Sequence, residues 1–384
     1  MLRISAAFDP NLGFSWCEPG LALRAARAVR RKVRPRSDIE EQRRLTRQAF
    51  ELGFDTVYTP DWRGPDALGL CGERWKASCE ITAGGMQVGT LVSPIPKYPR
   101  PAQLAERALI LSQATGGRFI LGVGAGDLYR PAVREQLGWT QGSLISLVRD
   151  YLKELIRDLD AGLAPGMQRP RIILGALGPQ MLRIAGELTD GAVISFSTED
   201  QANWARTKLF EGAERSGRDP SQLTLMQSVP VSVSADPALA RRRLALAVLP
   251  YLQGPDLPQK GATRVGYRAQ VERLGFGALL DEIDDHTRNS AKTETLLDLI
   301  PDALLDQLGY AGEPEGAPQA ISTLCKGMDE AVVRVTAAEE RFQSASQVLE
   351  SLRPGPRWDS VFSFQGSGPP SSVRSDLAQT PSTH

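Results

Sequence analysis

Two glycine-rich turns contain the residue types that could hold a flat or phosphorylated ligand. The first runs from Leu121 through Gly124, Ala125 and Gly126 to Asp127, directly after an apolar run. Small residues at the end of a strand let the backbone approach such a ligand closely. Asp127 follows at once, and we expect it to act as a general acid if its surroundings keep it protonated. Packing alone is the competing interpretation of these glycines.

The spacing of this turn argues against a dinucleotide-binding fingerprint. A G-x-G-x-x-G motif that began at Gly122 would need a third glycine where Asp127 stands. The turn also lies more than a hundred residues into the chain, without an acidic residue at the end of an obvious second strand.

The second turn, between Leu174 and Met181, precedes a predicted helix over Gln180–Leu188. Proline suits the first turn of a helix, and the glycine before it leaves backbone N–H groups open. A helix N-terminus of this kind can bind an anion, so we predict that a cofactor phosphate docks here, although a plain helix start has the same appearance. The residues concerned are Ala176, Leu177, Gly178, Pro179 and Gln180.

Short apolar strands alternate with amphipathic helices along the chain, which predicts an α/β fold with a parallel sheet. Eight strands are counted, as in a (β/α)₈ TIM barrel. We assign residues 1–352 to the barrel, 237–325 to a helical insertion between the seventh and eighth strands, and 353–384 to a disordered tail. The eight strands are Arg3–Phe8, Phe54–Tyr58, Met86–Val92, Phe119–Val123, Arg171–Leu174, Ala192–Ser195, Leu225–Val233 and Glu330–Val335.

Composition excludes several classes of function. Forty-five basic residues balance forty-five acidic ones among the 384, so no global field favours nucleic acid or an anionic membrane. Four scattered cysteines and two histidines make a disulfide framework, a metal site or a His-based triad improbable. Neither a signal peptide nor a membrane helix is evident, so we expect a cytoplasmic protein.

Four blocks of the sequence, in order, resemble the luciferase-like monooxygenases, and within them the branch that uses the deazaflavin coenzyme F420. The resemblance spans about residues 1–350. It implies a cofactor at the C-terminal ends of the barrel strands, with FMN as the alternative to F420. The blocks are Phe54-Asp-Thr-Val-Tyr-Thr-Pro-Asp61, Val88-Gly-Thr-Leu-Val-Ser93, Gly117-Arg-Phe-Ile-Leu-Gly-Val-Gly-Ala-Gly-Asp127 and Leu174-Gly-Ala-Leu-Gly-Pro179.

The resemblance also implies roles for particular residues. A non-prolyl cis peptide, which would support the cofactor ring, falls at Leu91-Val92. Asp61 and Trp62 match a position where many relatives have Asp-His. The departure matters because Trp62 cannot transfer a proton, so it would form an aromatic wall, while Asp61 caps a loop or orients substrate. Asp127 matches the proton donor of some deazaflavin enzymes.

The implied reaction is hydride transfer between reduced F420 and a carbonyl, imine or activated alkene of a small organic substrate. Three alternatives stay open at this point: an FMN-dependent monooxygenase of the same superfamily, a cofactor-free barrel enzyme, and a relative that has lost its chemistry. The form Gly-Ala-Gly-Asp in the first turn favours the deazaflavin. Dimers are common among the relatives, which leaves a homodimer open.

Overall fold

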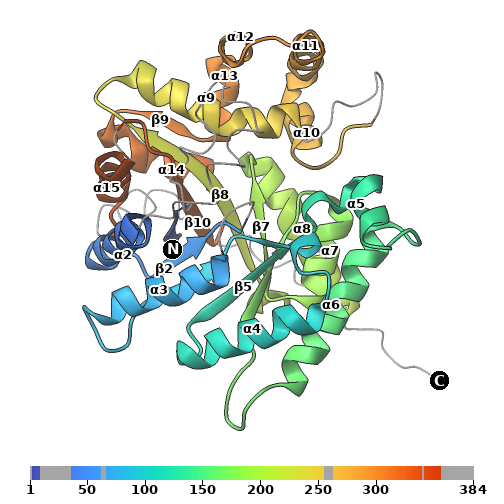
Figure 1. Cartoon of the computed structure of the whole chain (residues 1–384). Helices are drawn as coiled ribbons and strands as arrows, with labels where there is room; N and C mark the ends of the chain where they lie inside the picture. Colours follow the sequence, from blue (N-terminus) through green and yellow to red (C-terminus); the bar gives the residue numbers. More distant parts are fainter. Residues whose placement is uncertain (1, 9–35, 62–65, 255–262, 340, 356–384) are drawn as a thin grey trace, which may run out of the picture.

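A closed ring of parallel strands forms the centre of the protein, in a computed structural model that describes residues 2–8, 36–61, 66–254, 263–339 and 341–355. The last strand pairs with both the first and the seventh strand of the ring, so the sheet has no open edge there. The predicted TIM barrel is confirmed (Figure 1). The ring consists of β1 (Arg3–Ala7), β2 (Thr56–Thr59), β3 (Gln87–Thr90), β5 (Phe119–Gly124), β6 (Arg171–Gly175), β7 (Gly191–Ser195), β8 (Thr224–Val233) and β10 (Glu330–Val335).

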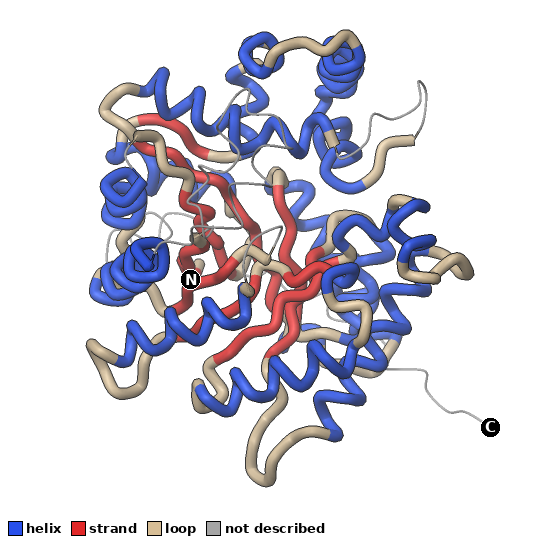
Figure 2. Tube along the Cα trace, viewed as in Figure 1, coloured by secondary structure: helices blue, strands red, loops and turns tan. Residues whose placement is uncertain are grey.

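Every strand of the ring is covered on both faces, which explains the nearly continuous apolar runs in the sequence. All residues of β5 and β8 are buried. Inward-facing side chains fill the barrel, while the outward-facing ones pack under the helices that Figure 2 shows around the strands. The inner cluster contains Ala7, Tyr58, Ile120, Ile173, Val193, Met226 and Val332.

The ring helices begin at residues suited to helix starts. Ser143 accepts a hydrogen bond from the Ser146 N–H at the start of α6 (Leu144–Ala161). Thr198 and Gln201 form a capping box at the start of α8 (Glu199–Arg215). Pro101 opens α4 (Pro101–Ala114), and Pro179 opens α7 (Pro179–Leu188). The remaining ring helix before β2 is α2 (Arg36–Glu51).

Two helices were not expected from the sequence. They are α3 (Ala67–Cys79) and the short α5 (Pro131–Gln136). The inward face of α3 carries Arg74, whose fully buried guanidinium donates to the Tyr58 carbonyl at 2.9 Å and to the Phe8 carbonyl at 2.9 Å. An arginine on the buried face interrupts the apolar stripe from which an amphipathic helix is predicted, so the sequence did not indicate α3.

Residues 237–254 and 263–308, between β8 and β10, form a separate helical layer, visible as the yellow and orange lobe of Figure 1. It has its own apolar core, which also includes Phe196 at the end of β7. A buried ion pair, Arg268–Asp284 at 2.6 Å, joins two of its helices. The layer contains α9 (Pro237–Gln253), α10 (Gly266–Val271), a π-helical turn (Glu272–Phe276), α11 (Gly277–Arg288), α12 (Thr293–Asp298) and α13 (Asp302–Leu308). The chain then returns to the barrel as β9 (Tyr310–Gly312), which pairs with β8, and α14 (Ala317–Leu324), whose buried side chains lie in the barrel core.

Several boundaries differ from those expected. The sequence predicts a final helix over Ala337–Leu352, but α15 (Arg341–Ser351) begins later, because residues 336–339 continue from β10 as an irregular segment. β9 adds an unexpected short strand inside the insertion, paired with β8. The third predicted strand ends at Thr90, and Ser93–Pro94 form the separate β4, which pairs with β5. Most of the predicted tail lies outside the described residues.

Candidate active site

The most distinctive backbone feature lies at the end of β3. The peptide bond Leu91-Val92 is cis, as expected. Both side chains are partly buried and pack on the inner cluster of the barrel, so they form an apolar surface at its C-terminal mouth. Active sites of barrel enzymes are built at this end.

The chain bulges at Leu91-Val92, and glycines on β5 and β6, the next two strands of the ring, provide the space for this bulge. A Cβ atom on Gly124 of β5 would stand 2.5 Å from Val92 Cγ2, and one on Gly175 of β6 would stand 3.3 Å from the same atom. On Gly122 it would lie 2.1 Å from the Thr90 carbonyl oxygen. The glycines of the first turn are therefore required for packing, because larger side chains would occupy the space in which Val92 lies at the mouth.

Asp61 anchors the chain that follows the bulge. Its side chain is fully buried and accepts hydrogen bonds from Ser93 Oγ at 2.8 Å and from the Tyr98 hydroxyl at 2.8 Å. Lys97 Nζ forms an ion pair with the other carboxylate oxygen. Burial, followed by the charge of Asp61, raises the pKa of Tyr98, so Tyr98 stays a hydrogen-bond donor. Asp61 therefore ties the end of β2 to β4 and to the segment that follows it. Trp62 lies outside the described residues.

Asp127 lies in a one-turn 3₁₀ helix, Gly126–Tyr129, directly after β5. Gly126 has a φ of +54°, and a Cβ atom there would approach Pro94 Cβ to 2.8 Å, so this turn packs on the segment that follows the bulge. The Asp127 side chain is 26% exposed, and its Oδ2 lies 3.7 Å from Arg130 Nη1. The carboxylate is therefore accessible at the mouth and has a cation beside it.

The second glycine turn leads into the uncapped N-terminus of α7. Gly178 is the N-cap residue, no side chain caps the helix, and nothing lies within 4 Å of where a Gly178 Cβ atom would be. Arg273 reaches this turn from the insertion and donates to the Leu177 carbonyl at 3.3 Å. No carboxylate of the described residues lies within ion-pair distance of Arg273. A helix N-terminus beside an unpaired guanidinium favours an anion.

Arg273 was not among the residues expected from the sequence. Gln270, one helical turn earlier, donates to the Phe196 carbonyl at 2.7 Å and accepts a bond of 3.2 Å from Arg273 Nε. These bonds fix the insertion against the ends of β6 and β7. The only sequence signal would have been the i, i+3 spacing of two polar residues in the insertion.

A second group of residues from the insertion and the barrel meets at the end of β7 and β10. Arg334 Nη1 donates to the Tyr251 hydroxyl at 2.7 Å, and Tyr251 packs edge-on against Tyr267 with ring centres 4.6 Å apart. Burial raises the pKa of Tyr267 to about 12, so it is neutral at physiological pH. Phe196 completes the group with a φ of +59°, a conformation that is unusual for a bulky residue and typical of functional sites.

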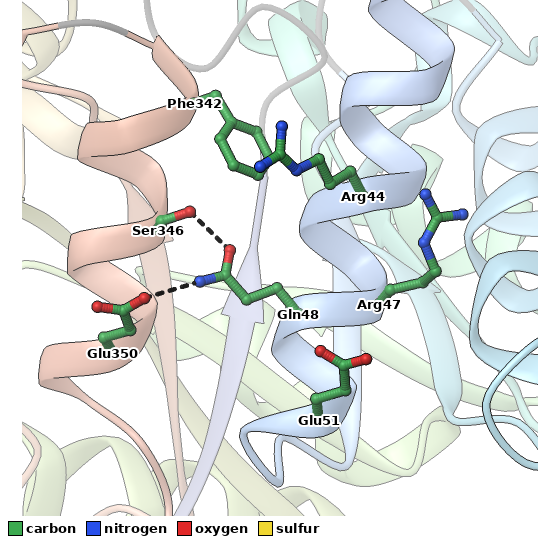
Figure 3. A pocket seen from close by; sticks show the side chains of 7 residues that line it. All are labelled: Arg44, Arg47, Gln48, Glu51, Phe342, Ser346 and Glu350. Carbon is green, nitrogen blue, oxygen red and sulfur yellow. Dashed lines mark hydrogen bonds between the residues drawn. The ribbon is translucent and has the colours of Figure 1, made fainter.

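A crevice of about 430 Å³ lies elsewhere, between α2 and α15 (Figure 3). Gln48 bridges the two helices, accepting from Ser346 Oγ at 2.6 Å and donating to Glu350 at 3.0 Å. The crevice belongs to the outer helical layer, so it is not part of the mouth. Within the described ranges no cluster of His, Cys, Asp or Glu could hold a metal ion. None of the helices described is long and apolar enough to cross a membrane.

Comparison with known proteins gives consistent matches. The family model described as luciferase-like monooxygenase matches residues 21–328. A 5,10-methylenetetrahydromethanopterin reductase of Methanolobus tindarius is 25% identical, over 72% of this chain and 84% of the relative. A putative coenzyme F420-dependent oxidoreductase of Mycobacterium tuberculosis is 26% identical, over 70% and 83%. The structure of the coenzyme F420-dependent tetrahydromethanopterin reductase from Methanopyrus kandleri superposes with a TM-score of 0.64 at 16% identity, over 93% and 99%.

Proposed function

The chain belongs to the luciferase-like monooxygenase family and is therefore an oxidoreductase, and from this premise we propose that it uses coenzyme F420 to transfer a hydride to or from an organic substrate. The reacting group would be a carbonyl, an imine or an activated alkene. The observation that carries the proposal is the apolar surface that Leu91 and Val92 form at the mouth, with an uncapped helix N-terminus after the next strand but one.

The residues at the mouth fit a tricyclic cofactor that carries a phosphate. Leu91 and Val92 offer an apolar face of the kind that a planar ring system can lie against. Gly124, Ala125 and Gly126 keep the neighbouring strand end free of large side chains. The phosphate-bearing side chain would bind at the start of α7, where the backbone N–H groups have no side-chain cap, the space at Gly178 is open and Arg273 contacts the turn. The residues of this turn are Ala176, Leu177, Gly178, Pro179 and Gln180.

When bound, a reduced deazaflavin supplies two electrons as a hydride. The chain then has to orient the substrate, exclude water and hold a proton for it. We assign the proton transfer to Asp127, because it lies at the mouth, directly after the strand that packs on the bulge. Its carboxylate takes a proton from the substrate when a hydride leaves, and the same group returns the proton in the reverse direction. Asp61 holds Ser93 and Tyr98 and so keeps the bulge in place, without itself reaching substrate.

The role of Asp127 predicts a selective loss of turnover. Asp127→Asn keeps the size of the side chain but cannot donate or accept a proton in the reaction, so kcat should fall by about 10²-fold or more while the affinity for F420 stays unchanged. The measurement is steady-state kinetics with F420 titrated separately by fluorescence. An unchanged kcat would assign the proton to another donor, of which Tyr129 is the nearest in sequence.

The role of Arg273 predicts a loss of affinity for F420 in place of a loss of turnover. Arg273→Ala removes the guanidinium beside the α7 N-terminus, so the affinity for F420 should fall about tenfold, the size of one charge-assisted hydrogen bond. Arg157→Ala is the matched control, since Arg157 is 70% exposed on α6 and, among the residues that the structure describes, pairs only with its neighbour Asp158. Equal affinities of the two variants would place the phosphate elsewhere.

Titration of the purified protein with F420 and, separately, with FMN tests the proposal. Selective binding of F420 supports it and leads to substrate screening under anaerobic conditions. Selective binding of FMN would move the protein to the oxygenating branch of the family. Binding of neither would contradict the proposal and favour a barrel that has lost its cofactor.

A further inference from the structure

We propose that the substrate is an organic acid, whose carboxylate or equivalent oxyanion binds to Arg334 and Tyr251 at the mouth of the barrel. This inference deepens the proposed function and rests on it, because it assigns a substrate class to the same site.

Arg334 stands at the inner face of the barrel, near the C-terminal end of β10. Alternation along the strand places Val332 in the inner cluster, and Arg334 follows two residues later on the same face. The register agrees, because Arg334 is aligned with Ala7 of β1, which also belongs to the inner cluster. The side chain is partly buried, so it points into the mouth and not into bulk solvent.

The charge of Arg334 lacks a counter-ion among the described residues. Its only side-chain partner there is Tyr251, through the hydrogen bond of 2.7 Å and through the ring, whose centre lies 5.1 Å from the guanidinium carbon. Lys97 and Arg130 differ, since Lys97 is paired with Asp61 and Arg130 with Asp127, while Arg273, on the α7 side of the mouth, bonds to Gln270 and the Leu177 carbonyl. A partly buried charge without a partner is costly, and a bound anion removes that cost.

Tyr251 strengthens the same site. Its hydroxyl oxygen accepts the hydrogen bond from Arg334, which leaves its own hydrogen to be donated. No acceptor for that hydrogen is found in the described part of the chain. Guanidinium and phenol together therefore present donors to one oxyanion, and the planar guanidinium fork matches a carboxylate.

The surrounding aromatic side chains indicate the body of the ligand. Phe196 lies 5.6 Å from both Tyr251 and Tyr267, ring centre to ring centre. The Gln270 bond to the Phe196 carbonyl holds this residue in its left-handed conformation. Such walls suit a flat, partly apolar molecule.

The arrangement of the ring separates this site from the proposed cofactor site. β10 lies halfway round the barrel from β5, whose glycines pack on the bulge. A substrate whose acidic end is held at Arg334 would extend across the mouth towards the bulge. Its reducible group would then lie some distance from its acidic group.

The test compares binding of benzoate, of the neutral benzyl alcohol and of inorganic phosphate by calorimetry. The variants are Arg334→Met, Tyr251→Phe and the control Arg157→Met, and circular dichroism checks that each is folded. We expect benzoate affinity to fall about tenfold in Arg334→Met, a few-fold in Tyr251→Phe and not in the control. Benzyl alcohol should bind equally to all. If Arg334→Met does not fold, Arg334→Lys replaces it, with a smaller loss expected because the fork is removed but the charge is kept.

Each result bears on one proposal separately. Anion binding that is absent, or equal in wild type and Arg334→Met, overturns the organic-acid inference. If inorganic phosphate binds more tightly than benzoate and its binding requires Arg334, the substrate is not a carboxylic acid but a phosphate ester. A fall in F420 affinity in Arg334→Met, measured by fluorescence, would overturn the inference by assigning Arg334 to the acidic tail of the cofactor. Arg334-dependent benzoate binding in a protein that binds neither F420 nor FMN would support the acid site and contradict the proposed function.

Discussion

Replacing Asp61 with alanine is expected to destabilise the protein by about 3 kcal/mol. The buried carboxylate is the shared acceptor for Ser93, Lys97 and Tyr98, and its removal leaves two buried hydroxyl donors and a partly buried cation without a partner. Lys97 is 32% exposed and can regain some hydration, which keeps the effect near the low end for a broken buried pair. The midpoint of chemical unfolding, followed by circular dichroism, measures the change.

A matched control separates burial from charge in this experiment. Asp281→Ala also removes an aspartate from an ion pair, with Arg264, but Asp281 is 73% exposed, so its loss should change stability by less than about 1 kcal/mol. Because Ser93 follows the bulge directly, Asp61→Ala should also weaken F420 binding, whereas Asp281→Ala should not. Similar stabilities of the two variants would show that Asp61 is not the anchor of β4.

Gly122→Ala is expected to destabilise the protein by a similar amount, because the added methyl group would clash with the main chain of β3. Its Cβ atom would lie 2.1 Å from the Thr90 carbonyl oxygen, which is main chain and cannot rotate away. The Thr90 hydroxyl also exchanges hydrogen bonds with the Gly122 carbonyl at 2.9 Å and with the Gly122 N–H at 3.0 Å. The strands would have to separate, at a cost of about 3 kcal/mol, the usual upper range for overpacking a core.

Gly72→Ala is the control for this variant, with an effect of opposite sign. Gly72 lies inside α3, and an added Cβ atom would meet only Leu111 Cδ1, at 3.6 Å, an ordinary contact. Alanine in a helix interior should stabilise by about 0.5–1 kcal/mol relative to glycine. Thermal unfolding of both variants, compared with the wild type, would therefore move in opposite directions. A stable, soluble Gly122→Ala protein with unchanged F420 affinity would contradict the packing argument.

The barrel was predictable because the signals for it are local. Strands that are buried on both faces appear as apolar runs, such as Phe119–Val123, and their helices begin at caps such as Ser143 and at prolines such as Pro179. The cis peptide at Leu91-Val92 was also expected, but from the family resemblance and not from the residues alone. The helix α3 was missed because its buried Arg74 interrupts the apolar pattern.

The residues that line the mouth could not be predicted from local signals of this kind. Arg273, Tyr251 and Arg334 are far apart in the chain and are unremarkable polar or aromatic residues in their own segments. They meet other groups only because the insertion packs on the ends of β6, β7 and β10, through contacts such as Arg273 to the Leu177 carbonyl. Local sequence patterns specify strands, turns and caps, since those depend on neighbouring residues. Long-range packing decides which charged side chains lack a partner and can therefore bind a ligand. No local sequence pattern contains that information.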